Sequence, residues 1–265
     1  MPDHHWMIRT QPPMTDLCTG YSDSLYRNRL QSLIGVDVLV EAVADKLLTA
    51  GLLDSTYFLY TSDHGFHLGE MRVPFFKVQP YDTDLNVPFM VRGPGIAAGS
   101  KVHALALNVD VAPTIAALFH TEPPPESLTD GRSLLPLLFT APAGTDGGGT
   151  SGGGEWRKDF LFEFWEGNLS QVGGAKPGGF CNHIISAANN TYQGVRTADG
   201  LKLVDFSNRT VYPNANSEDI EEAFNLTADP WEMNNLAKDP ASQPWVNRLR
   251  ARLAELRNCN KAGCW

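Results

Sequence analysis

The chain has 265 residues, of which 42% are hydrophobic and 19% are charged, a composition that supports a globular protein with a sizeable core. No apolar run approaches the roughly 20 residues that a membrane-spanning helix needs, so no membrane span is expected. The formal net charge is −9 and lysine and arginine are not clustered, which argues against a nucleic-acid partner.

In the first half of the chain, hydrophobic spacing predicts a helix over residues 24–50, with Gly51 as its stop signal. The β-rich run at 56–61 lacks polar alternation, which is typical of a strand covered on both faces of a parallel sheet. Residues 87–91 predict the next strand, and Asp110 is the expected N-cap of the helix in DVAPTIAALF. This order of elements predicts an α/β sandwich.

The second half has a different pattern. Residues 141–154 are rich in glycine and predict a flexible surface insertion between a main α/β domain (1–140) and a small subdomain (155–265). Within that subdomain, YQGVRT and LKLVDF flank Ala-Asp-Gly, which predicts a hairpin, and the short run EEAFNL follows. A closing helix is expected over residues 244–256. The subdomain should therefore be a small antiparallel sheet with one helix.

Cysteines and sequons favour an oxidising, secretory compartment, either extracellular or lysosomal. Cys259 and Cys264 are close enough in sequence to close a small disulfide ring, although a cysteine is also commonly a small buried hydrophobe. Residues 1–16 contain no apolar segment of the secretory-signal type. Four glycosylation sequons begin at Asn168, Asn189, Asn208 and Asn225.

Polar side chains follow the predicted strand at 56–61. Asp63 and His64 stand where the carboxyl end of a strand can aim them into a crevice, and a carboxylate beside an imidazole suits a divalent cation. A helix cap or a solvated turn is the alternative interpretation. His67 and Glu70 are expected to be surface or supporting residues.

The run YTSDHGFHLGE…K…YDTDLNVPFMVRGPGI resembles the sulfatase family of the alkaline phosphatase-like superfamily, and especially its N-acetylglucosamine-6-sulfatase and arylsulfatase branches. The similarity continues in DHHWMIRT, NVDVAPTIAAL, DGRSLLPLL, YQGVRT, NLTADPWEMNNLA and the C-terminal Cys-x₄-Cys. It covers nearly the whole chain apart from the Gly-rich insertion.

The resemblance implies an alkaline phosphatase-like α/β sandwich and a sulfuric ester hydrolase. It implies that Asp63 and His64 are ligands of one Ca²⁺ ion and that Lys77 binds the sulfate group. The substrate would be a sulfated sugar of N-acetylglucosamine-6-sulfate or glycosaminoglycan type, or an aryl sulfate. His5 matches a histidine of the glucosamine-6-sulfatase branch and is a candidate for substrate binding.

The family nucleophile is a formylglycine made from the first residue of Cys/Ser-x-Pro-x-Arg, and these 265 residues contain no such motif. The Asp-Asp pair that follows the family's first strand is also absent. The sequence is therefore expected to represent the C-terminal portion of a sulfatase, without its first strands, to leave a sheet edge and a helix face uncovered, and to show no turnover by itself.

Two alternatives remain open. One is a non-catalytic, sulfatase-derived protein that binds glycans, because the nucleophile motif is missing. The other is a metal-dependent phosphodiesterase of the same superfamily, in which an Asp-His pair after a strand also binds metal.

Overall fold

The fold was analysed in a computed structural model, which describes residues 2–9, 11–73, 75–121, 129–139, 156–165, 190–206 and 221–259. The predicted insertion at 141–154 lies outside these ranges, as do Asn168, Asn189, Asn208 and Cys264. No helix within the described ranges is long and apolar enough to cross a membrane.

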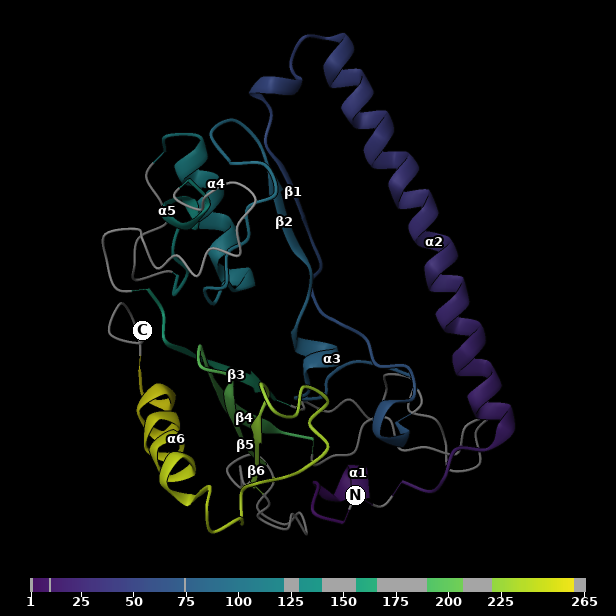
Figure 1. Cartoon of the computed structure of the whole chain (residues 1–265), viewed down its shortest axis with the longest axis vertical. Coiled ribbons are helices and arrows are strands. Elements are labelled where there is room, and N and C mark those ends of the chain that lie inside the picture. Colours follow the sequence, from purple (N-terminus) through teal and green to yellow (C-terminus); the bar gives the residue numbers. More distant parts are fainter. Residues whose placement is uncertain are drawn as a thin grey trace.

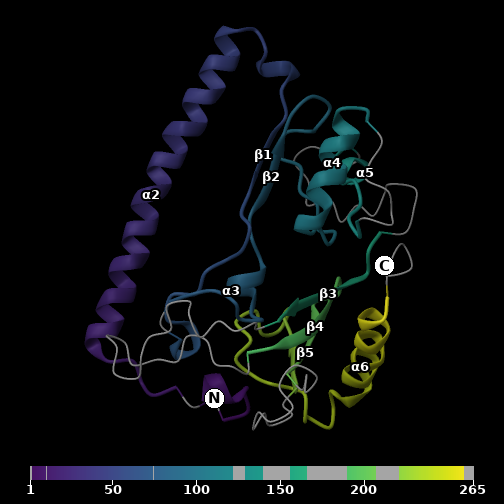
Figure 2. The ribbon, with the colours of Figure 1, turned by 180° about the vertical axis from the view of Figure 1, so that it is seen from behind.

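Helix α2 (Asp16–Thr49) runs along one side of the molecule, apart from the other helices (Figures 1 and 2). It begins earlier than the hydrophobic spacing indicates, because the Thr15 hydroxyl caps it by accepting the N–H of Cys18 at 3.2 Å. The expected uncovered helix face is confirmed by many exposed apolar side chains, which include Leu30, Leu33, Ile34, Val38, Leu39 and Val43.

Strands β1 (Phe58–Thr61) and β2 (Phe89–Arg92) form a two-stranded antiparallel sheet, with Tyr60 opposite Met90. The prediction of a parallel strand covered on both faces is therefore wrong. A parallel pair needs a crossover of a dozen or more residues, usually a helix. In the described residues of the connection there are only the one-turn elements η2 (Glu70–Arg72) and α3 (Asp82–Leu85), and the chain returns antiparallel.

A short helical turn, η1 (Leu53–Ser55), precedes β1. After β2 the chain forms η3 (Asn108–Asp110), α4 (Val111–Leu118) and α5 (Leu135–Leu138). Asp110 precedes α4 as expected, but its side chain does not cap that helix. Its buried carboxylate instead binds the Arg157 guanidinium at 2.7 and 2.9 Å and accepts the N–H groups of Leu107 and Arg132, each at 2.8 Å. Asp110 thus joins α4 to the chain that enters the second half.

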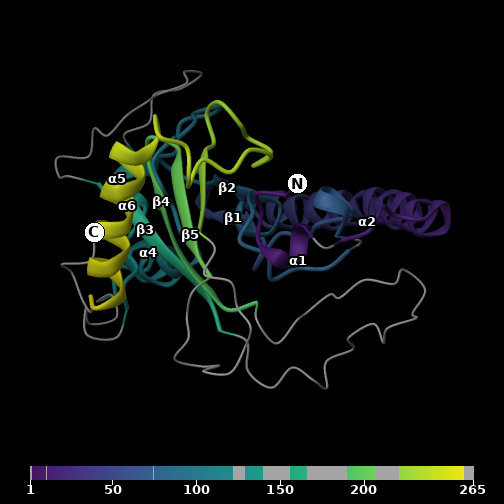
Figure 3. The same ribbon diagram turned by 90° about the horizontal axis from the view of Figure 1, so that it is seen from below.

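The C-terminal subdomain is a four-stranded antiparallel sheet in the order β3 (Asp159–Phe164), β4 (Tyr192–Thr197), β5 (Leu201–Asp205) and β6 (Glu221–Asn225). Helix α6 (Gln243–Arg257) packs along this sheet (Figure 3). The β4–β5 hairpin, β6 and α6 confirm the sequence predictions, whereas β3 was not predicted.

The core of the subdomain lies between the sheet and α6. Val195, Leu203 and Ala223 from three strands contact Val246 and Leu249 of the helix, and all are almost fully buried. The N-terminal segment with α1 (Trp6–Arg9) also lies on this subdomain, where Ile8 packs in one cluster with Phe224 and Tyr81. Residues from both ends of the chain are therefore held against the loop between β1 and β2.

Candidate functional site

The loop that follows β1 is fixed by a backbone contact with α3. Gly65 N–H donates to the Asp84 carbonyl at 2.8 Å, and Phe66 N–H donates to the Thr83 carbonyl at 2.9 Å. A Cβ atom at Gly65 would lie 2.0 Å from the Thr83 oxygen, so no larger residue fits this approach. Glycine is therefore required by close packing, and this packing sets the position of the preceding Asp63-His64 pair.

Asp63, His64 and Lys77 converge on one ring nitrogen. Nε2 of His64 lies 3.2 Å from an Asp63 carboxylate oxygen and 2.7 Å from Nζ of Lys77. Nδ1 of the same ring lies 2.7 Å from the Gly65 carbonyl oxygen, an acceptor only, so Nδ1 carries a proton. Nε2 then carries a lone pair, and it accepts a hydrogen bond from the Lys77 ammonium. A ring nitrogen whose tautomer is fixed by a bond at the other nitrogen is suited to bind a cation.

The environment of Asp63 keeps its carboxylate charged. Desolvation would raise the pKa of this carboxyl, but the neighbouring His64 ring, the His64 backbone N–H bond and the Lys77 charge together lower it below its usual value. The side chain is 82% exposed, so the site is open to solvent.

Asn108 was not singled out by its sequence but belongs to this site. Its side-chain amide donates to the carbonyl oxygens of Ser62 at 3.2 Å and Asp63 at 3.0 Å, and so anchors the loop from the side of α4. Nothing in the local sequence NVD distinguishes this asparagine from an ordinary turn residue.

His67 is buried, which excludes the surface alternative and leaves that of a supporting residue. Nδ1 of His67 lies 3.0 Å from each carboxylate oxygen of Asp84, and both side chains are only 3% exposed. Asp84 also accepts the N–H of Gln79 at 2.8 Å. Glu70, by contrast, is exposed as expected, and its carboxylate accepts the N–H of Leu68.

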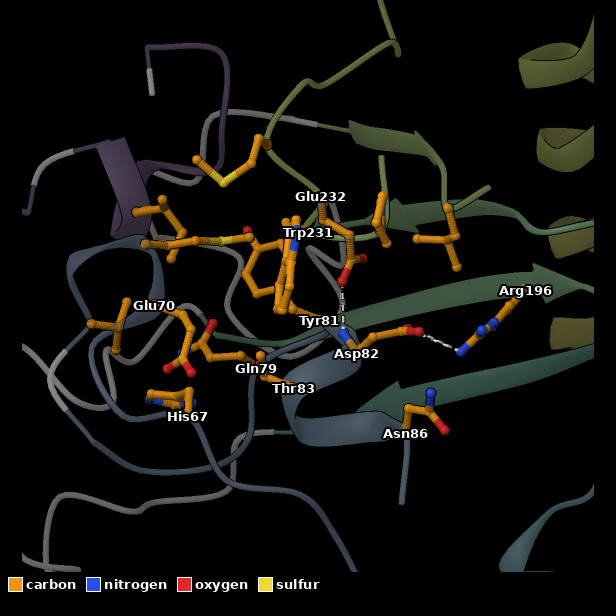
Figure 4. Close-up of a pocket in the computed structure, with 16 residues that line it drawn as sticks. His67, Glu70, Gln79, Tyr81, Asp82, Thr83, Asn86, Arg196, Trp231 and Glu232 are labelled. Atoms are coloured by element: carbon orange, nitrogen blue, oxygen red, sulfur yellow. Dashed lines mark hydrogen bonds and ion pairs between the residues drawn. The ribbon is translucent and has the colours of Figure 1, made fainter. Parts of the chain in front are cut away.

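A cavity of about 590 Å³ lies beside the His67–Asp84 pair (Figure 4). His67 and Glu70 line it from the loop after β1, and Asp82 lines it from α3. Arg196 of β4 and Trp231, which follows β6, complete the wall. The cavity therefore lies where the β1–β2 loop meets the C-terminal subdomain, a junction that no local sequence pattern predicts.

His5 lies in a different environment from Asp63 and His64. Its ring stacks on Phe206 with centroids 3.9 Å apart, and its backbone N–H donates to the buried Glu222, which also accepts the Tyr81 hydroxyl at 2.9 Å. Burial, with a smaller contribution from the Arg9 charge, lowers the pKa of His5 to about 3. Its substrate-binding role stays a prediction, because these contacts explain the residue as an anchor of the N-terminal segment.

Two cysteines in the described ranges, Cys18 and Cys259, are disulfide-bonded. Because Cys264 lies outside those ranges, the predicted pairing of Cys259 with Cys264 stays a prediction.

Asn225 is half-buried at the end of β6, where its side-chain oxygen accepts the N–H of Thr227 at 3.2 Å.

Among the described residues, no cluster of three or more histidine, cysteine, aspartate or glutamate side chains could hold a metal ion. Asp63 and His64 provide two donors of suitable chemistry, one oxygen and one nitrogen, whereas Ca²⁺ takes six to eight oxygen ligands. These two residues therefore fit a cation only in part.

Comparison with known proteins places these features in a family. The family model described as Sulfatase matches residues 4–121. Bovine N-acetylglucosamine-6-sulfatase is 35% identical over 277 aligned positions, which cover 98% of this chain and 45% of the relative. An arylsulfatase of Chlamydomonas reinhardtii is 34% identical over 97% of this chain and 38% of the relative. The chain thus spans less than half the length of these two relatives.

Solved structures share the fold of this chain. A structure described as a complex with its substrate D-glucosamine-2-N,6-O-disulfate superposes with a TM-score of 0.65 and 29% identity. The match covers 85% of this chain and 39% of that one. A phosphonate monoester hydrolase from Silicibacter pomeroyi superposes with a TM-score of 0.61 and 25% identity, over 86% of this chain and 40% of that one.

Proposed function

Because the chain belongs to the sulfatase family, we propose that it takes part in the hydrolysis of sulfate esters and that its substrate is a sulfated sugar. The observation that carries this proposal is the convergence of Asp63 and Lys77 on Nε2 of His64. A carboxylate, an imidazole lone pair and an ammonium group then share one solvent-accessible point at the end of β1.

Lys77 is proposed to bind the sulfate group. The nonbridging oxygens of a sulfate ester carry negative charge through the reaction, and an ammonium group held close to them stabilises that charge. Lys77 is half-buried and its ammonium lies 2.7 Å from Nε2 of His64, and no carboxylate of the described residues forms an ion pair with it.

Asp63 and His64 are proposed to contribute to a Ca²⁺ site. When bound, such a cation would polarise the sulfate oxygens as a Lewis acid. The Gly65 carbonyl holds the His64 ring in the tautomer that offers Nε2, and Asn108 fixes the backbone on either side of Asp63. These contacts position the two donors without supplying further ones.

The sugar class is proposed from the relatives. The bovine relative is named for N-acetylglucosamine-6-sulfate, and the structure with a TM-score of 0.65 is described with a disulfated glucosamine as its substrate. A 6-sulfated glucosamine unit is therefore the substrate that we propose first, with an aryl sulfate as the second.

A secretory location, extracellular or lysosomal, is proposed on independent grounds. Cys18 and Cys259 are disulfide-bonded, which suits an oxidising compartment, and one relative from Drosophila melanogaster is named as an extracellular sulfatase.

The test is sulfate release from N-acetylglucosamine-6-sulfate, measured by ion chromatography, with the protein purified from its natural source. We expect release that is lost in a Lys77→Met variant. The 265 residues expressed alone should bind the sulfated sugar without releasing sulfate, because they contain no formylglycine motif. Hydrolysis of a phosphodiester but not of the sulfate ester would favour the phosphodiesterase alternative, and binding without any hydrolysis by the natural protein would favour the glycan-binding alternative.

A further inference from the structure

Two residues that line the cavity beside the His67–Asp84 pair each carry a buried polar atom with no hydrogen-bond partner among the described residues. They are Nε2 of His67 and Nε of Arg196, and both side chains line the cavity. Buried polar groups in native proteins are nearly always satisfied, so an orphaned atom on a cavity wall indicates a missing partner. Two such atoms at separate positions around one cavity indicate a ligand with several polar groups.

The contact with Asp84 defines what the second ring nitrogen of His67 needs. Nδ1 lies 3.0 Å from both oxygens of the Asp84 carboxylate and donates to it. In the neutral ring Nε2 is then an acceptor and requires a donor from the cavity. Arg196 Nε–H requires an acceptor. A hydroxyl group can meet either need, because it donates one hydrogen and accepts others.

The charges around the cavity do not favour an anion. The Arg196 guanidinium is paired with Asp82 at 2.8 Å. The neighbouring Lys202 ammonium is paired with Glu232 at 2.6 Å and with Asp82 at 3.3 Å. Each of these cations is therefore neutralised by a wall carboxylate, and Glu70 adds a further negative charge. A sulfate or carboxylate group entering the cavity would meet no uncompensated positive charge from the described residues that line it.

The remaining wall is apolar and partly aromatic. Trp231, which is 70% exposed, lines the cavity together with Met71 and Met233. Figure 4 shows Trp231 near the centre of the view, with His67, Glu70 and Gln79 grouped on the left and Arg196 on the right. A broad ring face beside a few convergent polar groups suits a small ligand with both an apolar face and hydroxyl groups.

We propose that this cavity binds an uncharged pyranose ring, namely an unsulfated sugar unit of the glycan. The ring face would pack on Trp231, while sugar hydroxyls bond to His67 Nε2 and Arg196 Nε. The site differs from the sulfate site in charge, since the Lys77 ammonium has no carboxylate in direct contact among the residues that the structure describes. The proposal rests on the proposed function only for the choice of sugar, because the cavity itself is argued from its own atoms.

The test is a titration of the full chain with N-acetylglucosamine, followed by saturation-transfer NMR and calorimetry. We expect saturable binding, weakened roughly fivefold or more in Trp231→Ala because the stacking surface is lost. Trp165→Ala is the matched control, since Trp165 is 44% exposed and does not line the cavity; it should bind as the parent does. Trp231 is mostly exposed, so its removal should leave the fold intact.

Three outcomes would overturn the inference: no saturable binding by the parent chain, equal affinity in Trp231→Ala, or displacement of the sugar by inorganic sulfate. A Lys77→Met variant separates this inference from the proposed function. It should lose affinity for N-acetylglucosamine-6-sulfate relative to the parent while it binds N-acetylglucosamine unchanged. If sulfate hydrolysis by the natural protein fails but the neutral sugar still binds through Trp231, the cavity proposal stands alone.

Discussion

Nζ of Lys202 lies 2.6 Å from Oε1 of Glu232, and the two side chains are 0% and 2% exposed. Burial raises the pKa of the Glu232 carboxyl, although the Lys202 charge and hydrogen bond oppose this effect. The pair connects β5 to the segment after β6, and Lys202 also reaches Asp82 in α3. One buried cation therefore holds the C-terminal sheet to the loop that carries the candidate site.

Replacement of Lys202 by Met should destabilise the fold strongly. It would leave Glu232 buried without its cation, and removal of one partner from a buried ion pair typically costs about 3–5 kcal/mol. Lys238→Met is the control, because Lys238 is exposed, and it should change the free energy of unfolding by less than about 0.5 kcal/mol. Guanidinium unfolding followed by circular dichroism measures both. Equal stability of the two variants would show that the pair contributes nothing.

Gly65 and Gly35 form a second matched comparison. Gly65→Ala should destabilise by several kcal/mol and disturb His64, because the new Cβ would lie 2.0 Å from the Thr83 backbone oxygen. Gly35 lies in exposed helix α2 with nothing within 4 Å of such a Cβ, so Gly35→Ala should stabilise by about 0.5–1 kcal/mol. Thermal unfolding gives both values, and the same sign for the two variants would contradict this packing.

The fold was predictable where a local pattern determines it. The β4–β5 hairpin follows from Ala-Asp-Gly between two β-rich runs, and Gly200 takes the positive φ of 83° that such a turn uses. α6 follows from its helical spacing. The pairing of β1 with β2 was not predictable in this way, because an apolar strand without alternation is consistent with either direction, and the direction depends on a long connection.

The site was predictable only in part. Asp63, His64 and Lys77 were singled out by the sequence, and the structure brings them into contact. That contact agrees with the roles that the resemblance implies but does not test them. Asn108 comes from a distant segment, and the His67–Asp84 pair depends on α3 folding back on the loop, so neither leaves a signal in the local sequence.

The stability of the protein should depend on pH through His5. Its pKa falls from 6.5 to about 3 in the fold, chiefly by burial. The unfolded chain therefore binds this proton more tightly, and the stability that His5 contributes is complete above pH 6.5 and is lost as the pH falls towards 3. His5→Gln should remove this loss, which amounts to about 1.4 kcal/mol per pH unit.

The measurement is urea unfolding of the parent and His5→Gln between pH 7 and pH 4. The pKa of Glu222 is raised by burial, so its contribution has the opposite sign and falls as the pH rises above 4.5. Because both proteins retain Glu222, the difference between the two curves isolates His5. His103→Gln, at an exposed position, should follow the parent curve. Parallel curves for the parent and His5→Gln would refute a buried neutral imidazole.

Lys77 and a cation should compete for the same nitrogen. Nε2 of His64 has one lone pair, and the Lys77 ammonium lies 2.7 Å from it. Bound Ca²⁺ would also be repelled by that ammonium, and a unit charge at about 4 Å in a watery site contributes about 1 kcal/mol per charge. Lys77→Met should therefore bind Ca²⁺ at least about fivefold more tightly than the parent, although it binds the sulfated sugar less well.

Calorimetric titration of the 265-residue chain with CaCl₂ checks this prediction. With two protein donors, the parent should bind weakly, with a Kd of about 1 mM or above. Lys46→Met, an exposed change in α2, is the control for the loss of one positive charge and should match the parent. Adding Asp63→Ala to Lys77→Met should abolish the gain, because the carboxylate is the only oxygen donor of the pair. If Lys77→Met and the parent bind Ca²⁺ equally, Lys77 and the cation do not share His64, and the assignment of Asp63 and His64 as metal ligands loses its support.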